Sequence, residues 1–417
     1  MLLSSYNDWP GARPKIVGEV SQKERREIAV IAGQRSIPIL SSSQIVSKVI
    51  VQCARESGLS AVYAEVFSFE GNSIHVLEFP DCAGLGFREA SCTFRDATLI
   101  GVSRATTNHR GSTFVPVLNP GRDYVITPGE WLIFLSGGRE LARDRGRVGA
   151  KPPVPRRPPL AAAPLENLLI IGWNPNIHDV VAEFDEYVGP GTRVEIVSAY
   201  DPEEAQRRMA ECGSTSFANV RVGYRRANSI LRSALEALDV ATFDAMIVLA
   251  DESHGEPDPD ARTIMSLILL NDIRRAQSRG VGPRVVVELL NRKDRELLRG
   301  ADISDVVVSP DIASMLLTQI SQQQMLTAIY DELLNSGGVE IYLKPASHYA
   351  EPGKSTTFDQ FIASAHQNGE IALGLSLAPR SGQPGEAPQI LLTPSREAAW
   401  VCGEHDRLVV LATDLYA

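Results

Sequence analysis

The stretch that decides the fold reads NLLIIGWNPNIHDVVAEFDEYVGPGTRVEIVSAY and runs from Asn167 to Tyr200. Its apolar run at Leu168–Trp173 is too short for a helix and predicts a buried parallel strand. Apolar residues then recur at helical spacing up to the stop at Gly189–Gly191, and Arg193–Ala199 is a second strand rich in Val and Ile. This order predicts a βαβ unit, the opening of a doubly wound, Rossmann-like parallel sheet in an α/β protein.

Length and composition limit the number of globular cores and the kinds of partner that this chain can have. A chain of 417 residues that is 44% hydrophobic and 22% charged has room for two or three globular cores. The net charge of −10 argues against nucleic-acid partners, because these need a basic surface. No apolar run approaches the roughly 20 residues that span a bilayer, and the N-terminus lacks a secretion signal. We therefore expect a cytoplasmic chain. Its cysteines form no CxxC pair, so we expect them to be reduced thiols.

A segment rich in proline and arginine, residues 139–164, divides the chain. This composition resists packing and predicts a solvated, extended linker. A basic run of this kind also suits phosphates or lipid headgroups, but the density of proline favours the connector.

The sequences on the two sides of the linker repeat one another. Pro14–Val20 matches Pro283–Leu289, so that Glu19 falls on Glu288. Further matches follow in the same order: Ile45–Gln52 with Ile312–Gln319, Tyr63 with Tyr330, Asn119-Pro120 with Thr393-Pro394, and Glu130–Phe134 with Asp406–Val410. We therefore predict two copies of one domain, each with a long amphipathic helix, beginning at Ser43 or Pro310, and a small β-rich lobe at its end.

The two copies differ in length. In the second copy, a third apolar strand at Phe243–Ala250 and a long helix from Asp260 to Arg279 precede the matched strand at Pro283. Only about a dozen residues precede Pro14 in the first copy, so we expect this copy to lack its front half. A longer parent protein, a separate chain or a degenerate gene would account for that. The expected domains are residues 1–138 for the incomplete first copy, 139–164 for the linker, 165–338 for the second Rossmann-like lobe and 339–417 for the second β-rich lobe.

A series of motifs occurs in one order along the chain. They are VIVQCAR at Val49–Arg55, IIGWN at Ile170–Asn174, PGTRV at Pro190–Val194, IVLADE at Ile247–Glu252, DART at Asp260–Thr263 and ISDVVVS at Ile303–Ser309. Together they resemble the RCK domains (regulator of potassium conductance) in the cytosolic part of the CASTOR/POLLUX ion channels. In that family, two RCK domains follow a pore domain, assemble into a gating ring and couple cation binding, notably of calcium, to channel opening. The resemblance implies a homo-oligomer, a tetrameric ring, acting at the membrane with a pore partner that this chain lacks.

The turn after the first strand holds the candidate cofactor residues. A dinucleotide fingerprint needs three spaced glycines, so that backbone amides approach a pyrophosphate, and only Gly172 is in place. Trp173 and Pro175 would crowd that approach. Gly172, Asn174 and Asp201 remain candidates for cofactor contacts, although a helix N-cap at Asn174 or Asn176 and a helix start at Asp201 are simpler interpretations. NAD(H) is therefore not the favoured ligand.

Acidic residues crowd the loop after the third strand. The candidate metal ligands are Asp251, Glu252, Glu256, Asp258 and Asp260. Open α/β sheets place their ligands at this edge, and calcium prefers several carboxylate and carbonyl oxygens. Acidic residues at a helix start are also favoured by the helix dipole, so a solvated helix entry is the competing interpretation. Glu19 and Glu288 occupy matching positions, each near the ligand edge of its own sheet, and we expect them either to share a role in ligand binding or to pair with nearby arginines.

Two classes of function follow. The first is a non-enzymatic regulatory module that passes ligand binding to a channel pore. The second is a nucleotide-binding protein or oxidoreductase, suggested by the doubly wound fold alone. The sequence contains no GxSxG or HExxH motif and no placed acid or base, so we expect no enzyme activity.

Overall fold

The computed structural model describes residues 15–20, 23–33, 37–68, 71–108, 111–156, 167–253, 258–277, 282–298, 301–379 and 388–413. These residues form two compact units. The first unit contains the described residues up to 60 and those from 167 to 317, and the second contains those from 61 to 156 and from 318 onward. Neither unit coincides with one sequence repeat, because the chain passes from the first unit to the second within each repeat.

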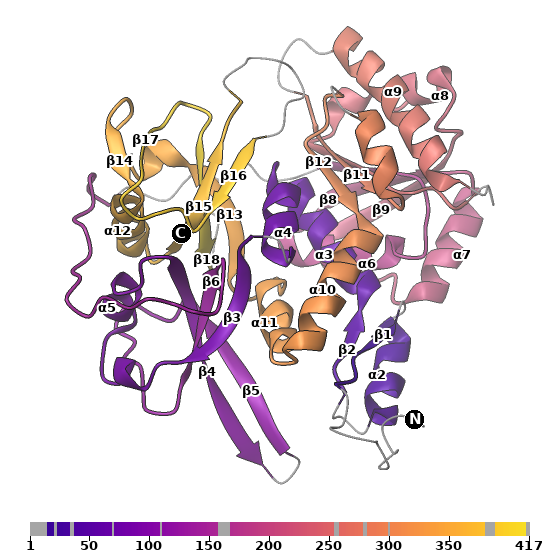
Figure 1. Ribbon diagram of the computed structural model, residues 1–417. Helices are drawn as coiled ribbons and strands as arrows, with labels where there is room; N and C mark the ends of the chain where they lie inside the picture. Colours follow the sequence, from indigo (N-terminus) through magenta and orange to yellow (C-terminus); the bar gives the residue numbers. More distant parts are fainter. Residues whose placement is uncertain are drawn as a thin grey trace. The chain divides into compact units, whose positions relative to one another are not determined.

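The first unit is built around a parallel sheet that has six strands among the described residues, in the order β12-β11-β10-β7-β8-β9 (Figure 1). The strands are β7 (Asn167–Ile171), β8 (Thr192–Ser198), β9 (Val220–Arg226), β10 (Ala245–Val248), β11 (Arg284–Leu289) and β12 (Asp305–Val308). Strand β7 pairs in parallel with both β8 and β10, so that Ile170 lies beside Ile196 and Ile247. This order confirms the doubly wound sheet, and its direction of winding switches between β7 and β10.

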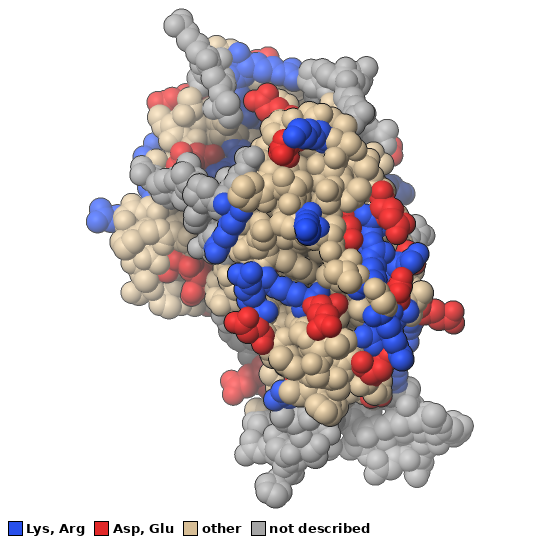
Figure 2. Space-filling model, turned by 90° about the vertical axis from the view of Figure 1, so that its left-hand side faces the viewer, with Lys and Arg blue, Asp and Glu red and all other residues tan. Residues whose placement is uncertain are grey.

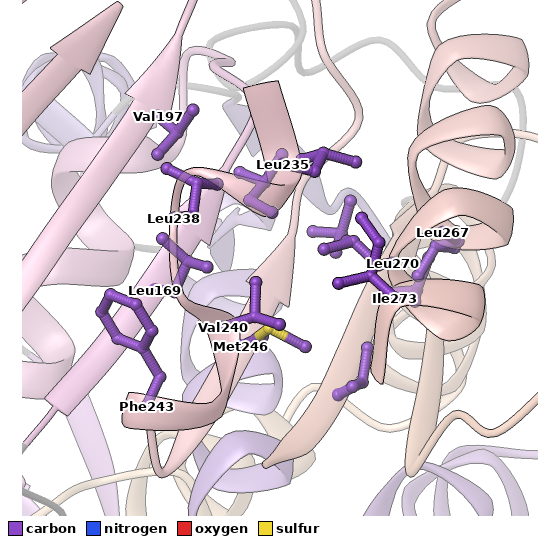
Figure 3. Packing of buried hydrophobic residues seen from close by; sticks show 14 of the residues in the cluster. Leu169, Val197, Leu235, Leu238, Val240, Phe243, Met246, Leu267, Leu270 and Ile273 are labelled. Carbon is purple, nitrogen blue, oxygen red and sulfur yellow. The ribbon is translucent and has the colours of Figure 1, made fainter. Parts of the chain in front are cut away.

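Helices cover the two faces of this sheet. Helices α6 (Ile177–Tyr187) and α7 (Pro202–Cys212) follow β7 and β8, whereas α8 (Arg232–Glu236) and α9 (Pro259–Gln277) flank β10. Figure 1 shows α8 and α9 on one side of the strands and α6 on the other. Leu267, Leu270 and Ile273 of α9 belong to the apolar cluster that also contains Leu169 and Met246 of the strands (Figure 3). The buried apolar run of the strands is thus matched by an apolar face of α9.

A helix of the first repeat packs on the sheet of the second repeat. Helix α3 (Ser42–Arg55) contacts β10, β11, β12 and α6. Its side chains Val49, Ile50 and Val51 are fully buried. The predicted long helix is wrong in one respect: α3 ends at Arg55, Gly58 adopts a φ of +95°, and α4 (Leu59–Phe67) is a separate helix. Hydrophobic periodicity continues across the turn, so it did not reveal the break.

The corresponding helix of the second repeat breaks in the same way. It consists of α10 (Ser309–Gln322) and α11 (Leu326–Leu333). The strands before these helices also match: β1 (Gly18–Val20) and β2 (Ile39–Ser41), joined by α2 (Lys23–Ala32), pair in parallel. Glu19 lies opposite Leu40, as Glu288 lies opposite Val307. The shared register confirms the repeat, although Pro14 lies outside the described residues.

The second unit contains the two β-rich lobes. In the described part of each lobe, four antiparallel strands form one sheet, in the orders β3-β6-β4-β5 and β13-β18-β15-β16. The strands of the first are β3 (Ser73–Glu78), β4 (Ala97–Asn108), β5 (Gly111–Leu118) and β6 (Trp131–Ser136). Those of the second are β13 (Glu340–Pro345), β15 (Ile371–Leu377), β16 (Gln389–Leu392) and β18 (Arg407–Ala412). Helix α5 (Phe87–Cys92) follows β3 in the first lobe, and β14 (Ser355–Thr357), α12 (Phe358–Asn368) and β17 (Ala399–Val401) complete the second. Equal strand order in both lobes is further confirmation of the repeat.

The two lobes share unusual backbone features at matching positions. A register shift precedes Gly101 in β4 and Gly374 in β15. Asn119 and Thr393, which the sequence match aligns, both have a φ of +42°. A positive φ is rare for residues other than glycine, so its presence at both corners points to one inherited backbone path.

The described part of the proline-rich linker, residues 139–156, differs from the expected solvated connector. Arg143 donates a hydrogen bond of 2.5 Å to Asp81, and its side chain is only 9% exposed. Arg147 forms an ion pair of 3.2 Å with Asp359. Figure 2 shows basic and acidic side chains interspersed on one face of the molecule. Arg143 and Arg147 of this segment are therefore held within the second unit by ion pairs with Asp81 and Asp359.

Candidate functional site

The candidate site lies at the carboxyl edge of the parallel sheet, where β7 and β10 diverge. Open α/β sheets bind ligands at this point. Gly172 follows β7 with a φ of +96°. A Cβ at this position would lie 2.7 Å from the carbonyl oxygen of Leu249. Gly172 is therefore required for the close approach of the chain after β10, whether or not a ligand is bound.

Hydrogen bonds join the two loops across this switch point. The backbone N–H of Trp173 donates to Asp251 Oδ1 at 3.2 Å, and that of Glu252 donates to the Trp173 carbonyl at 2.8 Å. The Trp173 ring packs edge-on against Tyr200, with 5.5 Å between centroids. The Trp173 amide, one of the donors that a pyrophosphate would use, thus already has an acceptor.

Asn174 holds the turn together from a buried position. Its Oδ1 accepts a hydrogen bond of 3.0 Å from the N–H of Asn176, and its Nδ2 donates to Glu288 Oε2 at 2.6 Å. Asn176 occupies the N-cap position of α6 but makes no capping hydrogen bond through its side chain. The side chain of Asn174 therefore connects the turn after β7 to strand β11.

Glu288 is the most buried carboxylate at this edge, with no exposed surface. It accepts hydrogen bonds from Ser309 Oγ at 2.5 Å and from Asn174, and the N–H of Ala250 lies at 3.4 Å. Burial raises the pKa of Glu288, and these donors oppose the rise. Among the described residues, the hydrogen-bond partners of Glu288 include no arginine, and its side chain has no exposed surface. These contacts make Glu288 the link between β7, β10, β11 and α10.

Asp201 lies on the β8–β9 side of the sheet. It occupies the N-cap position of α7, and its carboxylate forms an ion pair of 2.9 Å with Arg226 on β9. Both side chains are more than half exposed, so this pair contributes little to stability.

Two of the predicted metal ligands are already engaged by the protein. Asp251 Oδ1 accepts from the N–H and, at 2.5 Å, from the hydroxyl of Ser253 as well as from Trp173. Asp260 accepts from the N–H groups of Leu290, at 3.0 Å, and Asn291, at 2.7 Å. Burial raises the pKa of Asp260. The carboxylates of Asp251 and Asp260 therefore accept hydrogen bonds from two different loops.

Two of the other predicted ligands face solvent. Glu252 and Asp258 are exposed, and Glu256 lies outside the described residues. Partial burial and the neighbouring Asp251 raise the pKa of Glu252. In the part of the chain that the structure describes, no three His, Cys, Asp or Glu side chains are placed so that they could hold a metal ion. The described residues do not by themselves complete a calcium site.

Sequence reasoning missed three polar residues of this edge. Arg262 is 5% exposed, donates to Asn228 Oδ1 at 2.7 Å and faces Asp251 at 3.8 Å. Ser309 donates to Glu288, as described above. The DART and ISDVVVS motifs contained Arg262 and Ser309, but motif spacing alone did not show which carboxylates they face. No sequence signal pointed to Asn228.

The sequence of this chain is similar to a family model and to curated proteins. Residues 43–148 match the family model described as "Castor and Pollux, part of voltage-gated ion channel". The Lotus japonicus protein "Ion channel POLLUX" is 25% identical over 403 residues, which cover 88% of this chain and 43% of that protein. "Probable ion channel POLLUX" from Oryza sativa subsp. japonica is 23% identical over 401 residues, 88% of this chain and 41% of that protein.

The resemblance to the CASTOR/POLLUX ion channels is confirmed. The chain spans less than half the length of these two CASTOR/POLLUX relatives. Among solved structures, the human SLO3 gating ring matches with a TM-score of 0.65 and 14% identity, over 95% of this chain and 80% of that one. This likeness establishes the RCK-type fold. Across the described residues, none of the helices has the length and apolar character that crossing a bilayer requires.

Proposed function

We propose that this chain is a non-enzymatic regulatory module, a cytosolic gating-ring element of a CASTOR/POLLUX-like cation channel. The observation that carries the proposal is the tandem RCK plan, with the same strand order in both β-rich lobes, in a chain that resembles these channels over 88% of its length. In this proposal the chain acts at the cytoplasmic side of the membrane, together with a pore that belongs to another polypeptide segment.

The contacts at the sheet edge suggest how binding would be transmitted. A ligand that displaces the loops after β7 and β10 would move Asn174, which is hydrogen-bonded to Glu288. Glu288 in turn accepts a hydrogen bond from Ser309, the first residue of α10. The free energy of ligand binding would thus bias the position of α10, and α10 continues into the second unit.

The ligand that we propose is calcium, bound at the loop that follows β10. The exposed carboxylates Glu252 and Asp258 support this proposal, because among the described acidic groups of the loop they are the ones open to solvent. Backbone carbonyls or Glu256 would have to complete the coordination, since Asp251 and Asp260 already accept several hydrogen bonds.

Calcium titration by calorimetry tests the ligand. We expect heat of binding and a rise in melting temperature for the parent chain, and about tenfold weaker binding in Glu252→Gln and Asp258→Asn, because calcium affinity depends on the number of charged ligands. Glu211→Gln is the matched control, since this exposed carboxylate lies on α7 and should leave binding unchanged. Absence of both heat and thermal shift in the parent chain would exclude calcium but leave the gating-ring proposal standing. Micromolar binding of NADH in the same calorimeter would instead favour the nucleotide-binding alternative.

Solution mass tests the assembly. We expect light scattering to give one species of about four times 45.4 kDa, since gating rings are closed assemblies. A monomer at all concentrations, with or without calcium, would contradict a ring formed by this chain alone.

A further inference from the structure

The segment that follows β6 is bound to the first β-rich lobe. The N–H of Asp144 donates to the carbonyl oxygen of Thr93 at 2.8 Å, and Arg143 pairs with Phe94 in an isolated antiparallel β-bridge. The Arg143 guanidinium donates to Thr93 Oγ1 at 3.0 Å and to Asp81 at 2.5 Å. These partners lie on both sides of α5 in the chain, so the segment is held against the ends of that helix.

Further along, the same segment reaches the second β-rich lobe. Arg147 forms ion pairs of 3.2 Å with Asp359, near the start of α12, and of 3.5 Å with Glu397. The side chains of Arg147 and Asp359 are 13% and 12% exposed, so this pair is largely removed from water. We call residues 143–147 the strap, because they contact both lobes.

Asp359 is also bound within its own lobe. Arg396 donates to Asp359 Oδ1 at 2.9 Å, whereas Arg147 pairs with Oδ2. The N–H of Asp359 donates to the Arg396 carbonyl, and the N–H of Phe358 donates to the Ala398 carbonyl, both at 3.0 Å. When Arg147 leaves, Asp359 therefore keeps one guanidinium partner. Release of the strap thus avoids an unpaired buried charge, which is the main cost of breaking a buried ion pair.

The two lobes also contact each other directly. Strand β4 lies against β15, helix α11 packs on β5, and Asn119 Nδ2 donates to the carbonyl oxygen of Gly369 at 2.8 Å. On the side of α5 and α12, at the left of Figure 1, Arg396 Nη2 donates to the carbonyl oxygen of Ser91 at 2.6 Å. Packed strands thus join the lobes at one place, and guanidinium contacts join them at another.

We propose that the strap is a releasable fastening between the two β-rich lobes. While Arg147 is bound to Asp359, the helices α5 and α12 are held together, and when Arg147 leaves, the start of α12 is freed. The packed strands β4 and β15 remain in contact in both states and act as the hinge. This device goes beyond the proposed function, because it acts within the second unit and requires no ligand at the sheet edge.

Hydrogen exchange of the Phe358 and Asp359 amides, measured by mass spectrometry on the full chain, tests the strap. In Arg147→Met we expect these amides to exchange about tenfold faster, because a largely buried hydrogen bond between charged groups is lost. Arg143→Met should accelerate them about threefold, although the contacts of Arg143 given above lie in the first lobe. Arg145→Gln is the control within the strap, since its pair with Asp81 is 74% exposed on the arginine side, and it should change nothing.

The amide of Thr393, which donates to the Leu373 carbonyl at 2.8 Å on the strand side, should keep its protection in all three variants. Equal acceleration at Thr393 would overturn the proposal, because it would indicate general destabilisation and not release on one side. Unchanged exchange of Phe358 and Asp359 in Arg147→Met would overturn it too. So would an effect of Arg147→Met without one of Arg143→Met, since the contact would then be a local ion pair. If Arg147→Met folds poorly, the response of the second lobe to Arg143→Met decides alone.

Discussion

Gly374→Ala is expected to lower the free energy of unfolding by about 3 kcal/mol or more, because the added methyl group would collide with the backbone of a neighbouring strand. A Cβ at this position would lie 2.1 Å from the carbonyl oxygen of Leu391 and 2.8 Å from the Cα of Leu392. Both obstacles are backbone atoms of strand β16, so they move only if the strand pair separates. A melting curve should show the transition of the second unit, to which this lobe belongs, lowered by roughly 6–12 °C.

The repeat supplies graded controls for this variant. Gly101 is the matching glycine of the first lobe, and a Cβ there would lie 2.6 Å from the Val117 carbonyl, so Gly101→Ala should be destabilising but less so. Gly121→Ala adds a methyl group in open space and should leave the melting temperature within about 1 °C. If Gly374→Ala melted like Gly121→Ala, the close strand approach at the bulge would be refuted.

Glu288→Ala is expected to cost about 3 kcal/mol of stability. The substitution removes the acceptor of Asn174 Nδ2 and Ser309 Oγ, both in a buried setting, and leaves a cavity. Relief of a buried carboxylate offsets part of this loss, since burial raises the pKa of Glu288. Glu288→Gln keeps the volume and one acceptor oxygen, so we expect a smaller cost of about 1 kcal/mol. Urea denaturation of the three proteins at neutral pH measures these differences.

Glu19→Ala is the matched control, because Glu19 has the same register position in the first repeat. Its side chain is exposed, whereas that of Glu288 has no exposed surface. We expect Glu19→Ala to change stability by less than about 0.5 kcal/mol. A cost for Glu19→Ala equal to that of Glu288→Ala would show that strand position, and not the buried hydrogen bonds, determines the effect.

Much of the fold was predictable from the sequence, because buried parallel strands leave a continuous apolar run. Strands β7, β8 and β10 and helix α9 were located in this way, and the alignment of Asn119 with Thr393 matched two corners of equal backbone conformation. Strand β9 was missed. Strand β9 lies at the edge of the sheet and is partly exposed, so it accommodates the charged residues Arg221, Arg225 and Arg226. An edge strand has one neighbour and leaves only a weak hydrophobic signal.

The position of the candidate site could be predicted from the sequence, but the hydrogen-bond partners of its residues could not. Strand order placed Gly172 and Asp251 at one edge, and the structure brings their loops together. The sequence could not show that Asp260 binds the amides of Leu290 and Asn291, which lie some 30 residues away along the chain. Nor could it show that Asn174 and Ser309 converge on Glu288. These partners are far apart in sequence, and a charge count does not distinguish an engaged carboxylate from an open one.

The packing of α3 against the second repeat affects how this chain folds during its synthesis. Arg55, at the end of α3, and Arg284, at the start of β11, are 229 residues apart. At usual elongation rates, a ribosome needs roughly 10–50 s to make that interval. For most of this time the apolar face of α3, with Val49 and Ile50, has none of the strands β10 to β12 to cover it. The nascent first repeat is therefore expected to depend on chaperone protection until the second sheet has emerged.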